Sequence, residues 1–125
     1  MSTKILIIED DPSAARMMGY AFEHEGYSVF PAQNGLEGMK AARTEHPDII
    51  ILDVMLPGID GFEVCSRLKT SPDTSDIPII MISAKGQSID FETAQKVGAD
   101  EYIVKPVDPT DLIAKVEGYL SKTSA

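Results

Sequence analysis

The 125-residue sequence predicts an α/β fold with a five-stranded, doubly wound parallel sheet. Five short apolar runs alternate with five segments of helical periodicity. Three runs are nearly unbroken Ile, Leu, Val and Met, which is typical of strands buried on both faces. Because crossovers between parallel strands are right-handed, this alternation places helices on both faces of the sheet. The expected strands are Lys4–Ile8, Tyr27–Phe30, Ile49–Leu52, Ile79–Ile82 and Glu101–Val104.

Helix signals fall between the apolar runs. Two Asp-Pro pairs each place an N-cap carboxylate before a proline suited to the first helical position. An asparagine begins another helix, and an aspartate with a glutamate three residues later forms a capping-box-like pair. A weaker fourth helix is marked by apolar periodicity and stops at Gly98. The N-cap residues expected on this basis are Asp11, Asn34, Asp60 and Asp108.

Composition and charge exclude several classes of function. The formal net charge is −9, from 11 basic and 20 acidic residues. This balance argues against direct nucleic-acid binding, which needs clustered Lys and Arg. It suits a metal cation or a basic partner, and an acidic solvated surface is the ordinary alternative. The single cysteine, Cys65, cannot form an internal disulfide, and the first apolar run is too short for a signal or membrane segment. We therefore expect a cytoplasmic protein without membrane contact.

The chain length suits one domain with one core. We expect this domain over residues 1–121, followed by a short C-terminal tail, 122–125. Because the sequence ends after the fifth helical pattern, we expect no further domain within it.

Polar residues whose side chains can take part in catalysis or metal binding follow four of the expected strands. Glu9 and Asp10 follow the first strand, Asp53 the third, Ser83 the fourth and Lys105 the fifth. In open parallel sheets, ligands bind beyond the carboxyl ends of the strands. We therefore expect these side chains to converge on one patch.

A patch with several carboxylates has to resolve their repulsion. Two like charges about 4 Å apart cost roughly 4 kcal/mol at an effective dielectric constant of 20. Either one carboxyl is protonated or a cation binds, and oxygen ligands favour Mg²⁺ or Mn²⁺. Lys105 adds an ammonium group and Ser83 a hydroxyl donor. A carboxylate nucleophile, a metal and a cationic clamp are the parts of phosphoryl transfer, with Asp53 as the predicted acceptor.

Five short segments carry a family resemblance, through their order and their spacings. They are Ile8–Asp11, Leu52-Asp53, Leu56–Gly61, Ser83-Ala84 and Lys105-Pro106. With these segments the chain resembles the receiver domain of two-component response regulators over essentially its whole length. The resemblance implies a flavodoxin-like (βα)5 fold with strand order 2-1-3-4-5.

The resemblance also implies a role for each acid. Asp53 would be phosphorylated by a histidine kinase or a phosphotransfer protein. Asp10 would be a direct ligand of Mg²⁺ or Mn²⁺, and Glu9 would act on the metal largely through water. Asp53 and the main-chain carbonyl of Met55 would complete the protein ligands.

Further residues are implied to act after phosphorylation. Ser83 would be the switch hydroxyl that moves to the phosphoryl group, and Lys105 the clamp. Tyr102 would change rotamer with Ser83. The bond between Lys105 and Pro106 is commonly cis in the family, although cis is rare for X-Pro bonds in general.

The implied function is a phosphorelay switch rather than an enzyme acting on an external metabolite. The domain would catalyse only its own phosphorylation and slow hydrolysis. Phosphorylation would change the surface of the fourth helix, fifth strand and fifth helix, to regulate a downstream protein, a fused output domain or self-association as a homodimer. A stand-alone regulator and an excised domain of a larger protein both stay open. Met55 and Lys85 flank the site and are expected to influence the phosphoryl lifetime.

Several residues near these motifs have ordinary structural explanations. Asp11 and Asp60 are expected to cap helices rather than bind metal. Gly58 suits a turn, and Gly61 is expected to allow close packing. Cys65 is expected to pack in the interior, and the isolated histidines at positions 24 and 46 are expected on the surface.

Three other functions are alternatives to the switch. Aspartyl-phosphate hydrolases, which this site also resembles, have a general-acid Asp two residues after the nucleophile, where this chain has Met55. A flavin-binding module would need a phosphate loop after the first strand, where the acidic run Glu9–Asp11 would repel a phosphate. A degenerate receiver that serves only as a scaffold is disfavoured by the complete set of acids, hydroxyl and lysine.

Overall fold

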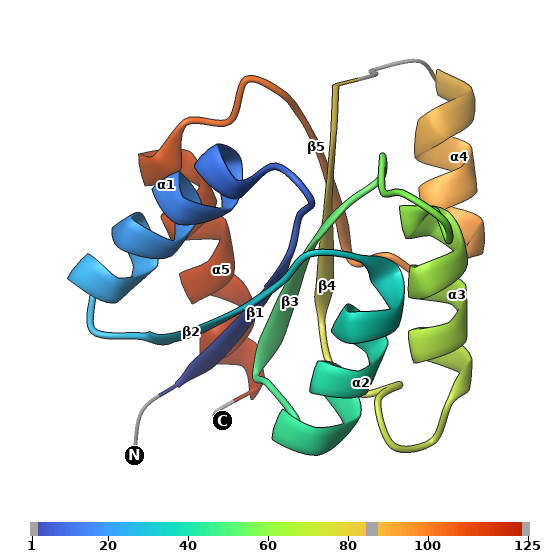
Figure 1. The fold of residues 1–125 in the computed structure, drawn as a ribbon, viewed down its shortest axis with the longest axis horizontal. Helices are drawn as coiled ribbons and strands as arrows, with labels where there is room; N and C mark the ends of the chain where they lie inside the picture. The colour runs from blue at the N-terminus through green and yellow to red at the C-terminus, as the bar shows by residue number, and fades with distance from the viewer. Residues whose placement is uncertain (1–2, 85–87, 124–125) are drawn as a thin grey trace.

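The computed structural model describes residues 3–84 and 88–123, which form five strands and five helices (Figure 1). The strands are β1 (Lys4–Ile8), β2 (Ser28–Ala32), β3 (Ile49–Asp53), β4 (Ile79–Ser83) and β5 (Glu101–Val104). The helices are α1 (Pro12–His24), α2 (Gly35–Glu45), α3 (Gly61–Thr70), α4 (Ser88–Lys96) and α5 (Pro109–Thr123). All strand pairs are parallel, in the order β2-β1-β3-β4-β5, which confirms the predicted fold.

The core lies in two layers, one on each face of the sheet. Helices α1 and α5 pack on one face, where Phe22, Leu112 and Val116 meet the inward side chains of the strands. Helices α2, α3 and α4 cover the other face (Figure 1). Every residue of β3 and β4 is buried, as their unbroken apolar runs predict. None of the helices in the described ranges is long and apolar enough to cross a bilayer.

The predicted bounds of β2 are wrong at both ends. The strand begins at Ser28 instead of Tyr27 and continues through Pro31 to Ala32, beyond the expected end at Phe30. Proline is compatible with this position because β2 is an edge strand, and only one of its sides needs hydrogen-bond donors. The carbonyl of Ala32 accepts a hydrogen bond from the amide of Glu9 at 3.0 Å, so the extra residues hold the chain that follows β1.

The predicted helix starts are confirmed. In each, a side-chain oxygen accepts a hydrogen bond from a backbone amide two or three residues further along, at 2.8–3.0 Å. These residues are Asp11, Asn34, Asp60 and Asp108.

The last helix extends beyond the predicted end of the domain. Helix α5 runs to Thr123 and thus passes the expected boundary at residue 121. The rest of the predicted tail, residues 124 and 125, lies outside the described residues, as does Lys85.

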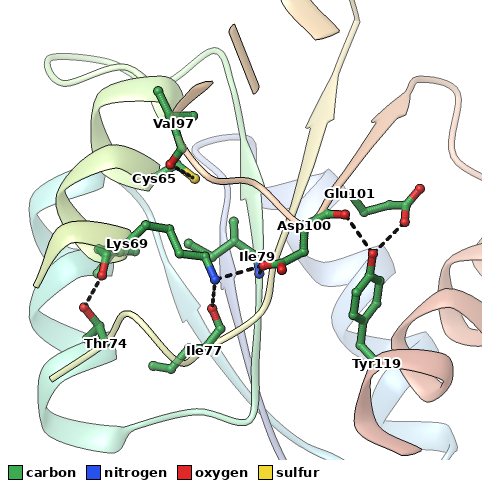
Figure 2. A network of polar contacts seen from close by, with 10 residues as sticks. Cys65, Lys69, Thr74, Ile77, Ile79, Val97, Asp100, Glu101 and Tyr119 are labelled. Atoms are coloured by element: carbon green, nitrogen blue, oxygen red, sulfur yellow. Dashed lines mark hydrogen bonds and ion pairs between the residues drawn. The ribbon is translucent and has the colours of Figure 1, made fainter. Parts of the chain in front are cut away.

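A polar network holds the amino-terminal ends of β4 and β5 together (Figure 2). The Oδ2 atom of Asp100 accepts hydrogen bonds from Lys69 Nζ at 2.9 Å and from the Ile79 amide at 2.8 Å. Lys69 also donates to the carbonyl of Ile77 at 2.7 Å, and the Tyr119 hydroxyl donates to the carbonyl of Asp100 at 2.7 Å. The network therefore ties α3 and α5 to the start of β5.

We predict that Asp100→Ala lowers the free energy of unfolding by about 2–3 kcal/mol, because it removes the counter-charge of the largely buried Lys69 ammonium and the acceptor of the Ile79 amide. Urea denaturation measures the change. Lys115→Ala is the control, since it removes only the exposed 3.4 Å pair with Glu101 and should cost less than about 0.5 kcal/mol. Equal losses in the two variants would show that the Asp100 network does not stabilise the fold.

Candidate functional site: an acidic cluster at the carboxyl ends of the strands

The parallel sheet brings the predicted site residues to one edge. Asp53 and Ser83 are the last residues of β3 and β4, while Glu9 follows β1 and Lys105 follows β5. In the strand register Asp53 pairs with Ile82 of the neighbouring strand. The sheet therefore joins side chains that are far apart in sequence.

Three carboxylates form the centre of this site. Glu9, Asp10 and Asp53 each offer an oxygen, and these oxygens all lie within 4.8 Å of one another. Glu9 is 3% exposed and Asp53 4%, while Asp10 is exposed and leaves the cluster open to solvent on its side. Three closely spaced carboxylate oxygens are the donor set that hard divalent cations prefer, so these residues fit Mg²⁺ or Mn²⁺.

Lys105 supplies the cationic side of the cluster. Its Nζ atom lies 3.4 Å from Glu9 Oε1 and 3.8 Å from Asp53 Oδ2. The peptide bond between Lys105 and Pro106 is cis, as the family resemblance predicts. The Lys105 amide donates a 2.7 Å hydrogen bond to the carbonyl of Ser83, so the backbone of Lys105 is held directly by β4.

Glu9 is the most strongly perturbed acid of the cluster. Burial of its carboxyl, a hydrogen bond with Asp53 and the charge of Asp53 together raise the pKa of Glu9 to about 7, against the opposing effects of the Asp11 amide and the Lys105 charge. Without a bound cation, Glu9 is thus partly protonated near neutral pH. The amide of Asp11 donates to Glu9 Oε2 at 3.2 Å and fixes the direction of the carboxyl.

Backbone contacts hold the chain around Asp53. The Met55 amide donates to Asp53 Oδ1 at 3.3 Å and orients the carboxylate. The Val54 amide donates to the carbonyl of Ile82 at 3.0 Å, which continues the pairing with β4 one residue past the strand. The segment that carries both Asp53 and the Met55 carbonyl is therefore tied to the sheet.

The two predicted switch residues lie on neighbouring strands. Ser83 is 1% exposed at the end of β4. Tyr102, on β5, is half-buried, and its ring meets Phe91 of α4 edge to face, with 4.6 Å between the ring centroids. A side-chain movement of Tyr102 would thus change a contact with α4.

The structure brings Glu9, Asp10, Asp53 and Lys105 together as the sequence predicts, and it shows contacts that the sequence did not predict. Sequence reasoning assigned Glu9 to the metal through water, whereas the structure also pairs Glu9 directly with Lys105 and with Asp53. It also gave no role to Lys69 or Asp100. No local pattern predicts that pair, because its partners come from different elements and meet only in the folded chain.

Comparisons with known proteins agree with this fold and show the family. The sequence profile described as "Response regulator receiver domain" matches residues 5–117. The chain is 40% identical over 123 residues to the alkaline phosphatase synthesis transcriptional regulatory protein PhoP of Bacillus subtilis, with 98% of this chain and 50% of PhoP covered. It is 42% identical over 120 residues to the DNA-binding dual master transcriptional regulator RpaA of Synechocystis, with 96% and 50% covered. Among solved structures, a CheY-like receiver domain protein from Methanospirillum hungatei superposes with a TM-score of 0.93 at 27% identity, with 99% of this chain and 98% of that one covered.

The fold and the acidic cluster define a regulatory α/β domain of the phosphoacceptor class. The chain belongs to the response regulator receiver domain family of two-component systems. It spans about half the length of the curated relatives it matches.

We predict that the metal-free protein loses stability as the pH rises from about 5 to 8. A carboxyl whose pKa is higher in the folded state stabilises the fold below its unfolded pKa, and this contribution is lost as the pH rises through the folded value of about 7. Glu9→Gln should remove most of this dependence and raise the free energy of unfolding at pH 8 by roughly 1–3 kcal/mol.

Urea denaturation in chelator at pH 5 and pH 8 tests this. Glu23→Gln, a neutralised acid on the exposed face of α1, is the control and should follow the parent protein. A parent protein equally stable at both pH values would contradict the account of Glu9.

Proposed function

We propose that this receiver domain is switched by transfer of a phosphoryl group to Asp53 from a histidine kinase or a phosphotransfer protein. The observation that carries the proposal is the placement of the Asp53 carboxylate among Glu9, Asp10 and the Lys105 ammonium. Family membership supports it, since receiver domains belong to two-component systems.

Asp53 is the proposed nucleophile. One carboxylate oxygen attacks the phosphorus, a new O–P bond forms, and the P–N bond of the phosphohistidine donor breaks. The electron pair of that bond leaves with the imidazole nitrogen, which takes a proton from water. The Met55 amide, 3.3 Å from Asp53 Oδ1, holds the carboxylate in one orientation for the attack.

Glu9, Asp10, Asp53 and the Met55 carbonyl would hold a divalent cation, Mg²⁺ or Mn²⁺. When bound, the ion would neutralise charge that develops on the phosphoryl oxygens. The carboxylates of Glu9 and Asp10 would hold the cation next to the acceptor, because an oxygen of each lies within 4.8 Å of an oxygen of Asp53.

Lys105 and Ser83 are the proposed clamp on the phosphorylated form. Lys105 Nζ already lies 3.8 Å from Asp53 Oδ2, so only a small movement brings it to a phosphoryl oxygen. The Ser83 hydroxyl would donate from the neighbouring strand end. Slow hydrolysis of the acyl phosphate then resets the switch, so the domain acts only on itself.

The output would travel through Tyr102 to α4. If Ser83 moves toward the phosphoryl group, Tyr102 follows into the space that it leaves, and the edge-to-face contact with Phe91 is lost. This changes the surface formed by α4, β5 and α5, where a partner, an output domain or a second copy would bind.

The relatives support a role for the domain in controlling a regulatory output. PhoP and RpaA are transcriptional regulators, and this chain covers half of each. We infer that the domain controls an output that belongs to the same polypeptide or to a separate protein in the cytoplasm. Direct nucleic-acid contact by the receiver itself is disfavoured by its net charge of −9.

We predict that Asp53→Asn abolishes labelling by acetyl phosphate and leaves the circular dichroism spectrum unchanged. The amide keeps the shape of the side chain and removes the nucleophilic oxygen. Intact-mass spectrometry with Mg²⁺ and acetyl phosphate measures the labelling. Asp60→Asn is the matched control, because asparagine still caps α3 and should label like the parent. Persistent labelling of Asp53→Asn would assign the phosphoryl group to another residue.

We further predict that excess chelator reduces labelling of the parent protein at least ~100-fold, since the metal is needed to offset the carboxylate repulsion. Added Mg²⁺ or Mn²⁺ should restore it. Labelling at an unchanged rate in chelator would remove the metal from the proposal.

A further inference from the structure

Gly61 is the first residue of α3 and lies directly against the backbone that carries Asp53. A Cβ atom at position 61 would lie 2.3 Å from the carbonyl oxygen of Asp53 and 2.7 Å from the Cα atom of Val54. The Gly61 amide donates a 2.8 Å hydrogen bond to the carbonyl of Val54. Helix α3 thus begins in contact with the peptide group that follows the acceptor.

The glycine is needed here for space. Its φ angle is not in the left-handed region, unlike that of Gly58 in the preceding loop, at +77°. Glycine is also a poorer helix former than alanine, by about 1 kcal/mol in helix interiors. Conformation and helix propensity therefore do not require glycine at position 61, whereas the approach to Asp53 and Val54 does.

A side chain at position 61 would have to move backbone rather than side chains. A methyl group could be accommodated only if α3 retreats, which breaks the bond from Gly61 to Val54, or if the peptide between Asp53 and Val54 shifts. Val54 joins Asp53 to Met55, so either change displaces the acceptor carboxylate and the Met55 carbonyl together. Divalent-ion sites and nucleophilic attack both tolerate little displacement.

We propose that Gly61 is a positioning residue of the phosphorylation site, which fixes the Asp53–Met55 backbone through the close approach of α3. The inference rests on the proposed function and adds a residue that does not contact the reacting atoms. Asp60 supports the arrangement, because its cap holds the first turn of α3 in place.

Gly61→Ala tests the proposal through metal binding and phosphorylation. Mn²⁺ affinity is measured by electron paramagnetic resonance of the free ion, and labelling by acetyl phosphate is measured by intact mass. We expect at least ~10-fold weaker Mn²⁺ binding and at least ~10-fold slower labelling at saturating metal. In the metal-free protein, the backbone amide resonances of Val54 and Met55 should shift.

Two glycine-to-alanine variants serve as controls. At Gly38 the added Cβ would lie 2.5 Å from Ile8 Cδ1, so the overlap is as close but involves a side chain. Gly38→Ala should lower the unfolding midpoint and leave Mn²⁺ affinity within about 2-fold. At Gly118 the added Cβ would meet no atom within 4 Å apart from its chain neighbours and the backbone of its own helix, and Gly118→Ala should keep both affinity and labelling.

Parent-like Mn²⁺ affinity and labelling in Gly61→Ala would overturn the proposal, as would an equal loss of affinity in Gly38→Ala. If Gly61→Ala unfolds, it is measured in 1 M trimethylamine N-oxide, which favours the compact state. Failure of Gly61→Ala to fold in trimethylamine N-oxide also contradicts the proposal, because the added methyl group would then disrupt the core as a whole and not the site alone. A parent protein that binds Mn²⁺ but is not labelled would refute the proposed function and leave the Mn²⁺ test of Gly61 valid.

Discussion

Repulsion among carboxylates at one edge of the sheet is the constraint on which this site depends. Parallel strands end at the same edge, so Glu9 and Asp53 are brought together and buried, with Asp10 beside them. Such a group is stable only if its charge is offset. Lys105 offsets part of it, protonation of Glu9 offsets more near neutral pH, and a divalent cation would replace that proton. The phosphoryl group proposed for Asp53 would add negative charge to the same balance, and this change in charge is how the site would act as a switch.

The scaffold keeps these charges in place from both ends of the sheet. At the site, backbone hydrogen bonds donated by Val54 and Lys105 to β4 continue the strand pairing past the last residues of β3 and β5. At the opposite end, Asp100 joins α3 and α5 to the start of β5 (Figure 2). Because the register of β5 against β4 is the same along the whole strand, the Asp100 network at the start of β5 helps to set the position of Lys105 directly after its end. Stability far from the site thus contributes to its geometry.

The sequence predicted much of this because its strongest patterns are local. Unbroken apolar runs marked β3 and β4, and N-cap residues marked the helix starts, whereas the order of the strands came from the family resemblance. The errors of the sequence prediction fell where tertiary context decides: β2 continues through Pro31 because it lies at the edge. The direct pairing of Glu9 with Lys105 and the Lys69–Asp100 pair depend on distances between separate elements. The space that Gly61 provides was expected, but the peptide group that fills it became visible only in three dimensions.

Chemical mapping of the acyl phosphate tests whether Asp53 is the phosphoryl acceptor. Borohydride reduces an aspartyl phosphate to homoserine, and peptide mass spectrometry then locates the changed residue after incubation with acetyl phosphate and Mg²⁺. We expect homoserine at position 53. Homoserine at position 10 or at any other position, or none under conditions that bind Mg²⁺, would contradict it.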